Sequence, residues 1–169
     1  MVVEVPAGTS EKWEVDAATG ALVLEFEDGA PRIVRYLAYP ANYGMVPRTL
    51  LPSEEGGDGD PLDVVLLGSA VERGRVVQAR PVGLLRLLDG GERDDKIIAV
   101  PATGPFEGVH SMEQLEGRYP GVLEILETWF TRYKGAGAIV SEGFADRAEA
   151  LRMIEGAAAA FDARASRLR

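Results

Sequence analysis

Short apolar stretches, several of them alternating with polar residues, recur along the first hundred residues of the chain. Period-two alternation and compact Val/Leu/Ile runs between turn residues predict β-strands. The predicted strands cover residues 2–5, 12–15, 21–27, 31–37, 62–67, 76–88 and 97–100. Asp28-Gly29 indicates a hairpin, and Pro81 with Gly83 indicates a bend or bulge in the long strand. Short strands at this spacing, without long helices between them, predict a small β-barrel.

Helical periodicity is confined to the C-terminal part of the chain. Residues 122–133 place apolar side chains at i, i+3, i+4 and i+7, and residues 151–168 place them at near-heptad spacing. Residues 111–114 fit a capping box that opens one short turn. We therefore expect a mainly β (α+β) fold in which two C-terminal helices flank the barrel. Nothing resembles a linker or repeat, so residues 1–169 are predicted to form a single domain.

Composition excludes several classes of protein. The net charge of −9 argues against nucleic-acid binding, which depends on basic contacts with phosphate. No apolar run approaches the roughly 18 residues of a membrane span, and no signal-peptide pattern opens the chain, so we expect a cytoplasmic protein without a membrane partner. The absence of cysteine excludes disulfides and thiolate chemistry. A single histidine, His110, excludes a multi-histidine metal site and disfavours a Ser-His-Asp triad.

The segment Asp58-Gly59-Asp60-Pro61-Leu62-Asp63 places three carboxylates within six residues. They repel one another unless a cation lies between them. Gly59 and Pro61 turn the backbone sharply, and a predicted buried strand begins at once, so Asp63 starts a core element and needs a partner. Hard oxygen ligands at this density indicate magnesium, manganese or calcium.

Two other interpretations of this segment are a solvated acidic turn and a calcium-binding EF-hand loop. A solvated acidic turn is common, and for an arbitrary Asp-Gly-Asp it is about as probable as a metal site. An EF-hand loop requires acids at positions 1, 3 and 5, glycine at 6 and glutamate at 12. Counted from Asp58, those last three positions hold Leu62, Asp63 and Ser69, so the EF-hand pattern fails.

A second acidic turn and the scarcity of lysine extend the candidate site. The chain has three lysines, against fifteen arginines, and each lysine lies beside an acid or a tyrosine. An arginine-preferring genome explains the scarcity but not the neighbours. If a barrel brings the strand ends to one mouth, carboxylates there could hold more than one divalent ion, beside donors that suit a small, highly charged oxyanion. The acidic candidates are Glu4, Glu14, Asp58, Asp60, Asp63, Asp89 and Asp94. The donors are Lys12, Arg32, Lys96, Lys134, Tyr39, Tyr43 and Tyr133.

These segments, in this order, resemble the soluble family I inorganic pyrophosphatases over nearly the whole chain. The resemblance is carried by residues 2–6, 12–14, 39–44, 58–64, 80–83, 89–96 and 133–134, and Asp-Gly-Asp-Pro-Leu-Asp is close to a family signature. It implies a five-stranded, OB-like closed β-barrel with helices packed on it. It also implies hydrolysis of pyrophosphate to two phosphates, dependent on several Mg²⁺ ions for which Mn²⁺ could substitute.

The resemblance also implies roles for individual residues. It implies that Asp58, Asp63 and Asp94 hold the first metal, that Asp89 and Glu14 hold further metals, and that Glu4 lines the same cavity. Asp60 matches the carboxylate that accepts a proton from the attacking water. The resemblance also implies that six residues bind the phosphates and that Tyr39 supports them. The six are Lys12, Arg32, Tyr43, Lys96, Tyr133 and Lys134.

Several alternatives stay open at this point. Arg32 is assigned to the phosphate, but Arg35 is the alternative because the spacing before Tyr39 resembles the fungal and animal group of the family. We expect a homo-oligomer, either a hexamer as in bacteria or a dimer as in that group. Two other functions stay open. One is a binding module without chemistry, and the other is a hydrolase acting on nucleotides or polyphosphate. Pyrophosphate is preferred because no apolar base pocket is evident near the motifs.

Overall fold

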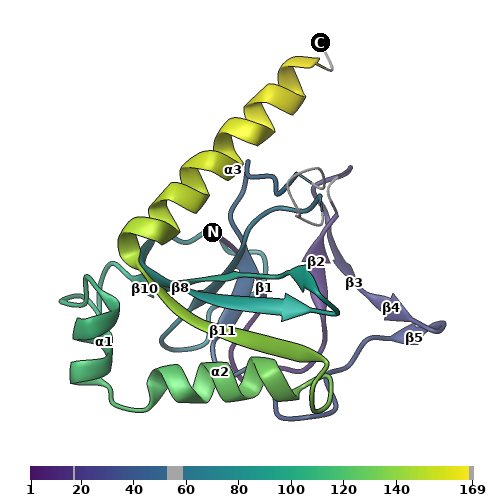
Figure 1. Ribbon diagram of the computed structural model, residues 1–169. Coiled ribbons are helices and arrows are strands. Elements are labelled where there is room, and N and C mark those ends of the chain that lie inside the picture. The colour runs from purple at the N-terminus through teal and green to yellow at the C-terminus, as the bar shows by residue number, and fades with distance from the viewer. Residues whose placement is uncertain (17, 53–58, 168–169) are drawn as a thin grey trace.

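A curled β-sheet forms the centre of the molecule, as the computed structural model shows (Figure 1). The structure describes residues 1–16, 18–52 and 59–167. The strands are β1 (Val2–Val5), β2 (Trp13–Val15), β3 (Leu22–Leu24), β4 (Phe26–Glu27), β5 (Ala30–Pro31), β6 (Asn42–Met45), β7 (Asp63–Leu66), β8 (Ala79–Asp89), β9 (Glu92–Arg93), β10 (Lys96–Pro101) and β11 (Ile139–Asp146). The helices are α1 (Met112–Arg118), α2 (Val122–Arg132) and α3 (Arg147–Arg167). The described part of the chain is thus mainly β with three helices.

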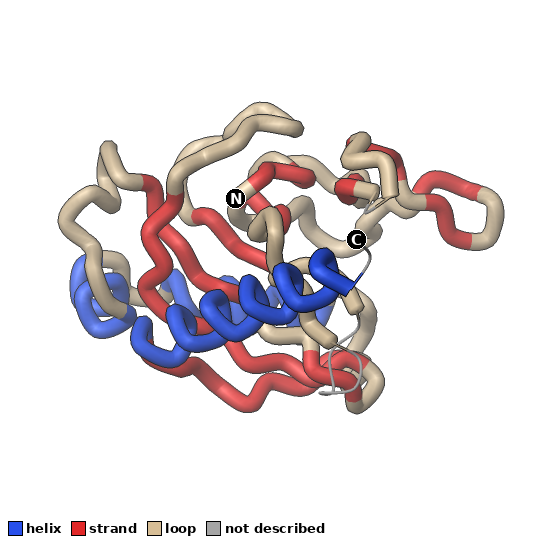
Figure 2. Tube along the Cα trace, turned by 90° about the horizontal axis from the view of Figure 1, so that it is seen from above, coloured by secondary structure: helices blue, strands red, loops and turns tan. Residues whose placement is uncertain are grey.

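The central sheet is open, so the predicted closed five-stranded barrel is wrong. Seven strands pair in the order β1-β6-β7-β10-β8-β11, with β9 also paired to β8, and the sheet curls into a half-barrel (Figure 2). Only β7 and β10 run parallel among its described pairs. The outer edge of β8 pairs with β11, and no ladder joins β11 to β1 among the described strands. The sequence did not predict β11, because Ser141, Glu142 and Gly143 interrupt its apolar pattern.

Both faces of the sheet are covered, which explains the uninterrupted apolar run of β7. Val65 and Leu67 pack in one cluster with Trp129 of α2, whereas Val64 and Leu66 pack in a second cluster beneath α3. Strands buried on both faces carry continuous hydrophobic sequence rather than alternation. The sheet therefore lies between α2 and α3, and the start of β7 is held firmly from both sides (Figure 1).

The N-terminal hairpins differ from their predicted strands. The predicted strand 21–27 is divided into β3 and β4 at Glu25, and the predicted strand 31–37 is wrong beyond its first residue. Backbone bonds instead join three segments: Arg32 N–H donates to Glu25 at 2.8 Å, Lys12 N–H to Arg32 at 2.9 Å, and Glu25 N–H to Lys12 at 2.9 Å. These bonds bring Lys12, Glu25 and Arg32 close together.

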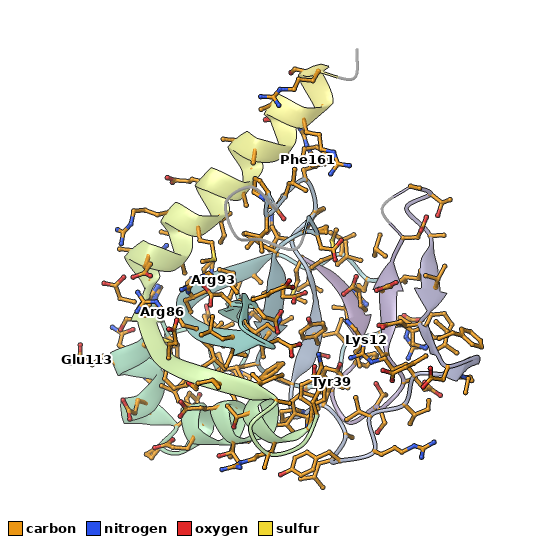
Figure 3. The ribbon with its side chains drawn as sticks, turned by 45° about the vertical axis from the view of Figure 1, so that its right-hand side comes forward. Lys12, Tyr39, Arg86, Arg93, Glu113 and Phe161 are labelled. Atoms are coloured by element: carbon orange, nitrogen blue, oxygen red, sulfur yellow. The ribbon has the colours of Figure 1, made fainter. Side chains whose placement is uncertain are left out.

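The two predicted C-terminal helices are confirmed as α2 and α3; α2 begins at the predicted residue, and α3 begins four residues earlier than predicted. Ser111 caps α1, where its side chain accepts a hydrogen bond from the Gln114 N–H at 3.2 Å, although the helix runs seven residues rather than one turn. The helix predicted over residues 151–168 is α3, which begins at Arg147. The far half of α3, near Phe161, lies against the segment that precedes β7 (Figure 3), and the Leu50 N–H donates to the Ala157 carbonyl there. In the described residues, each helix is too short or too polar to cross a bilayer.

Candidate active site

One cavity of about 560 Å³ gathers most of the predicted site residues. Its charged and tyrosine lining is Glu4, Lys12, Glu14, Asp16, Glu25, Arg32, Tyr43, Asp60, Asp63, Asp89, Asp94, Lys96, Tyr133 and Lys134. Every predicted site residue that the structure describes is in this set except Tyr39. Asp58, predicted as a metal ligand, lies outside the described residues. The acids and cations therefore converge from segments that are far apart in the chain.

The parallel pairing of β7 with β10 places Asp63 beside Lys96. The two residues are register partners at the starts of their strands, and Asp94 lies two residues before Lys96. Lys96 is 3% exposed, and its ammonium donates to Asp63 Oδ2 at 2.6 Å and also hydrogen-bonds to Asp94 Oδ1. A lysine thus lies between two of the predicted metal ligands.

The charges of these three groups depend on one another. Burial alone would raise the pKa of Asp63, but the Lys96 and Lys12 ammonium groups outweigh it and lower that pKa below its ordinary value. Burial raises the pKa of Asp94, against the opposing effect of Lys96. Burial would likewise lower the pKa of Lys96, yet Asp63 and Asp94 raise it well above its ordinary value. Lys96 therefore remains charged, and the partly buried carboxylates of Asp63 and Asp94 depend on it.

A β-bulge directs Glu4 into the cavity. The pairing of β1 with β6 shifts register between Val3 and Val5, which leaves Glu4 as the extra residue. Its Oε1 accepts a hydrogen bond from the Val15 N–H at 2.8 Å, linking β1 to the β2 segment. Glu4 is 4% exposed, and burial raises its pKa to about 7. Burial and the nearby Glu25 carboxylate also raise the pKa of Glu14.

All three lysines of the chain line this cavity. Lys134, just after α2, hydrogen-bonds to Asp89 at the end of β8. The Lys12 ammonium lies 4.6 Å from the centroid of the Tyr43 ring. Arg32, held by the backbone junction described above, pairs with Glu25. Lysine is thus concentrated at the place where the acids meet, which an arginine-preferring composition does not explain.

Tyr39 lies behind the cavity wall and supports the aromatic side chains that line it. Its ring centroid is 5.4 Å from that of Tyr43 and 4.5 Å from that of Trp129. Trp129 in turn stacks on Tyr133, with centroids 4.7 Å apart and planes 7° apart, and its indole N–H donates to the Leu37 carbonyl. The buried face of α2 therefore positions Tyr133 at the cavity.

Comparisons with known proteins decide the family. The family model for inorganic pyrophosphatase matches residues 1–162. The chain belongs to the inorganic pyrophosphatase family. An inorganic pyrophosphatase of Gluconobacter oxydans is 39% identical over 168 residues, covering 95% of this chain and 89% of that protein. The inorganic pyrophosphatase of Helicobacter pylori has a solved structure that is similar with a TM-score of 0.81, at 31% identity over 95% of this chain and 91% of that one. A type I inorganic pyrophosphatase of Toxoplasma gondii is similar with a TM-score of 0.86, at 30% identity over 95% of this chain and 78% of that one.

Two acids of this pyrophosphatase cavity were missed by sequence reasoning. Glu25, which interrupts a predicted strand, pairs with Arg32 at the cavity wall. Asp16 also lines the cavity, and its side chain accepts hydrogen bonds from Thr19 in the β2–β3 turn. Neither lies in a motif, and an acid in a turn or at a strand break is ordinarily solvated. Only the three-dimensional junction of Lys12, Glu25 and Arg32 indicates that Glu25 belongs to the site.

The donor set fits hard divalent cations, although a complete ligand cluster is not formed among the described residues. Carboxylate oxygens dominate the lining, and they are the ligands that magnesium and manganese prefer. In residues 1–16, 18–52 and 59–167, no three acidic or histidine side chains lie together in a group that could hold a metal ion. Lys96 and Lys134 instead compensate Asp63, Asp94 and Asp89. These three carboxylates are thus already paired with cations, and the cations are the chain's own lysines.

Proposed function

We propose that this chain hydrolyses inorganic pyrophosphate to two phosphates, with magnesium as its metal. The observation that carries the proposal is the cavity that combines clustered carboxylates with all three lysines of the chain. Membership of the inorganic pyrophosphatase family supports it. Carboxylates alone would repel a diphosphate, and cations alone would bind it without promoting attack by water. A protein of net charge −9 also needs such local cations to attract an anionic substrate.

We infer that Asp58, Asp63 and Asp94 hold a first divalent ion and that Asp89, Glu14 and Glu4 serve further ions. Bound divalent ions would neutralise phosphate charge and lower the pKa of coordinated water. The raised pKa of Asp94, Glu14 and Glu4 supports this inference, because burial and neighbouring acids disfavour their charged forms more than the nearby lysines favour them. Glu4, Asp63 and Asp89 lie on strands of the central sheet, Asp94 lies between two of its strands, and Glu14 lies on β2 of a separate two-stranded sheet.

Asp60 is proposed as the acceptor of the proton from the attacking water. It lines the cavity and is exposed to solvent. A carboxylate in this position can take a proton from water in the cavity and release it to solvent. Its backbone is fixed, because the Leu51 N–H donates to the Asp60 carbonyl at 2.9 Å. The loop thus holds the acceptor at the mouth of the cavity.

The cations and tyrosines are proposed to bind the phosphate oxygens. These residues are Lys12, Arg32, Tyr43, Lys96, Tyr133 and Lys134, and each lines the cavity. Arg32 rather than Arg35 is assigned to the phosphate, because only Arg32 lies in the lining. Lysine and arginine that neutralise both phosphoryl groups stabilise the charge that develops on the leaving phosphate. Catalysis on this account consists mostly of positioning and electrostatics.

Phosphate release from magnesium pyrophosphate by the purified protein tests the proposal. We expect release that a chelator abolishes and added magnesium restores. A protein that binds magnesium pyrophosphate but releases no phosphate would be a binding module, and the proposal would be wrong.

A further inference from the structure

Asp95 is a buried carboxylate to which the proposed function assigns no role. Its side chain is 2% exposed, and it does not belong to the lining of the cavity where the acids and lysines meet. Its neighbours in sequence, Asp94 and Lys96, both line that cavity. Because successive side chains of an extended segment alternate in direction, Asp95 leaves the backbone on the side opposite to its neighbours. A buried carboxylate is costly unless it is paired, so its contacts indicate what it does.

The carboxylate of Asp95 takes the place of a backbone acceptor beside β8. In the register that pairs β8 with β9 and β10, Asp94 lies opposite Leu87. Two residues that form a hydrogen-bonded pair in an antiparallel ladder ordinarily exchange both backbone bonds. The Asp94 N–H donates to the Leu87 carbonyl at 2.9 Å, but the Leu87 N–H donates to Asp95 Oδ1 at 3.0 Å. A side chain thus replaces the Asp94 carbonyl, and the strand is interrupted between β9 and β10.

The position of Asp94 depends on this pair of bonds to Leu87. Lys96 is held from two sides, because it has register partners in both β7 and β8. Asp94 lies outside the strands. Leu87 is 0% exposed and belongs to the core cluster that packs against α2, so its peptide groups are a fixed anchor. The turn that carries Asp94 is therefore tied to the core at Leu87, once by its own backbone and once by Asp95.

Arg93 compensates the charge of Asp95 without taking over its hydrogen bond to β8. Arg93 Nη1 lies 3.2 Å from Asp95 Oδ2, and Arg93 Nη2 lies 3.3 Å from a carboxylate oxygen of Glu142 on β11. The arginine side chain is 48% exposed, whereas the hydrogen bond between Asp95 and Leu87 is buried. The ion pair and the hydrogen bond are made by different partners, so substitutions can remove one and keep the other.

We propose that Asp95 is a positioning residue for Asp94, and that its hydrogen bond with the Leu87 N–H fixes the direction in which the Asp94 carboxylate enters the cavity. The inference rests on the proposed function, in which Asp94 helps to hold the first divalent ion. Without the Asp95 acceptor, the Leu87 N–H would be left unpaired in the core unless the Asp94 carbonyl turned to meet it. That turn would move the Asp94 side chain. Removing a group that orients a metal ligand lowers metal affinity by about 10–100-fold.

Calorimetric titration with Mn²⁺ in the absence of substrate tests this role. We expect Asp95→Ala to bind Mn²⁺ about 10–100-fold more weakly than wild type. Asp95→Asn keeps an oxygen that can accept from Leu87 and should bind Mn²⁺ as wild type does. Asp95→Glu keeps the charge but carries its oxygens one methylene farther from the backbone, so it should bind Mn²⁺ more weakly. In the alanine and glutamate variants, the magnesium concentration that gives half-maximal phosphate release should rise in parallel.

Two controls separate positioning from charge and from stability. Arg93→Gln removes the ion pair and leaves the hydrogen bond to Leu87, so Mn²⁺ affinity should be unchanged. Leu115→Ala removes a buried side chain of α1, a helix that contributes no residue to the cavity lining, so it should lower stability without changing Mn²⁺ affinity.

The outcomes distinguish this inference from the proposed function. Folded Asp95→Ala and Asp95→Glu proteins that bind Mn²⁺ as tightly as an active wild type would overturn the inference alone. Weakening by Asp95→Asn and Arg93→Gln, with Asp95→Glu unaffected, would show that the charge matters rather than the hydrogen bond, and would also overturn it. Equal weakening by Leu115→Ala would reduce the effect to lost stability, with the same consequence. Wild-type protein that neither binds Mn²⁺ nor releases phosphate would overturn both the inference and the proposed function.

Discussion

The buried Lys96 and the partly exposed Asp63 form an ion pair at the starts of two parallel strands, with Lys96 Nζ 2.6 Å from Asp63 Oδ2. The same ammonium reaches Asp94. The positive charge that this pair of carboxylates requires is therefore supplied by a side chain of the protein itself. A divalent ion bound by Asp63 and Asp94 must compete with Lys96 for their oxygens.

Replacing Lys96 by methionine should strengthen metal binding in the absence of substrate. The substitution removes the competing cation and leaves two carboxylates repelling each other, so we expect Mn²⁺ to bind about tenfold more tightly. Calorimetric titration with Mn²⁺ measures this. The metal-free variant should also be less stable by about 1–3 kcal/mol, because two partly buried carboxylates lose their counter-charge and hydrogen-bond donor.

Arg86→Met is the control for Lys96→Met, because Arg86 pairs with Glu149 away from the cavity. It should leave Mn²⁺ affinity unchanged. Equal or weaker Mn²⁺ binding by Lys96→Met would show that Lys96 does not compete with metal at these carboxylates.

Glu4→Gln should stabilise the metal-free protein at alkaline pH. Burial raises the pKa of Glu4 from 4.5 to about 7, so the folded protein favours the neutral carboxyl. Folding stability is then full below about pH 4.5 and is lost as pH rises towards 7, which at pH 8 costs about 3 kcal/mol. The glutamine keeps an oxygen to accept from Val15 and has no charge to bury.

Urea denaturation of wild-type and Glu4→Gln protein in chelator, between pH 4 and 8, measures this effect. The two free energies of unfolding should agree at the acid end and separate above pH 5, with the variant more stable. Curves that remain parallel over the whole range would show that Glu4 carries no such penalty.

Thr49→Val should destabilise the segment that carries Asp60. The Thr49 hydroxyl is buried, donates to the Val46 carbonyl at 2.6 Å and accepts from the Leu62 N–H at 2.9 Å, so it bridges the two ends of this segment. Valine has the same shape but leaves both backbone groups unpaired. We expect a loss of about 1–3 kcal/mol in the free energy of unfolding and a lower kcat.

Thr49→Ser keeps the hydroxyl and serves as the matched control. It should retain most of the stability and the activity in urea denaturation and phosphate-release assays. A valine variant as stable as the serine variant would show that the bridge does not hold the segment.

Much of the fold could be predicted because its elements have strong local patterns. The helix over residues 122–133 and the run after Asp63 are examples, because burial on one helix face or on both sheet faces leaves a clear apolar pattern. Whether the sheet closes into a barrel could not be predicted, because that depends on which strand pairs with the outer edge of β8. That strand, β11, contains Ser141 and Gly143 and has no continuous apolar pattern.

The members of the site were more predictable than their pairing. An acid such as Asp63 stands out because charged residues rarely begin buried strands. The place of Lys96 between Asp63 and Asp94 follows from parallel register across β7 and β10, which no local pattern specifies.

The central claim is that the protein hydrolyses pyrophosphate in the cavity lined by its acids and lysines, with Asp60 as proton acceptor. The variant Asp60→Asn tests this claim most directly. Phosphate release at saturating magnesium is measured for wild type, for Asp60→Asn and for Asp162→Asn, a control that changes an exposed aspartate on α3. We expect kcat to fall about 10²–10⁴-fold in Asp60→Asn, with Mn²⁺ binding retained and the control unchanged. Near-normal turnover by Asp60→Asn would contradict the account.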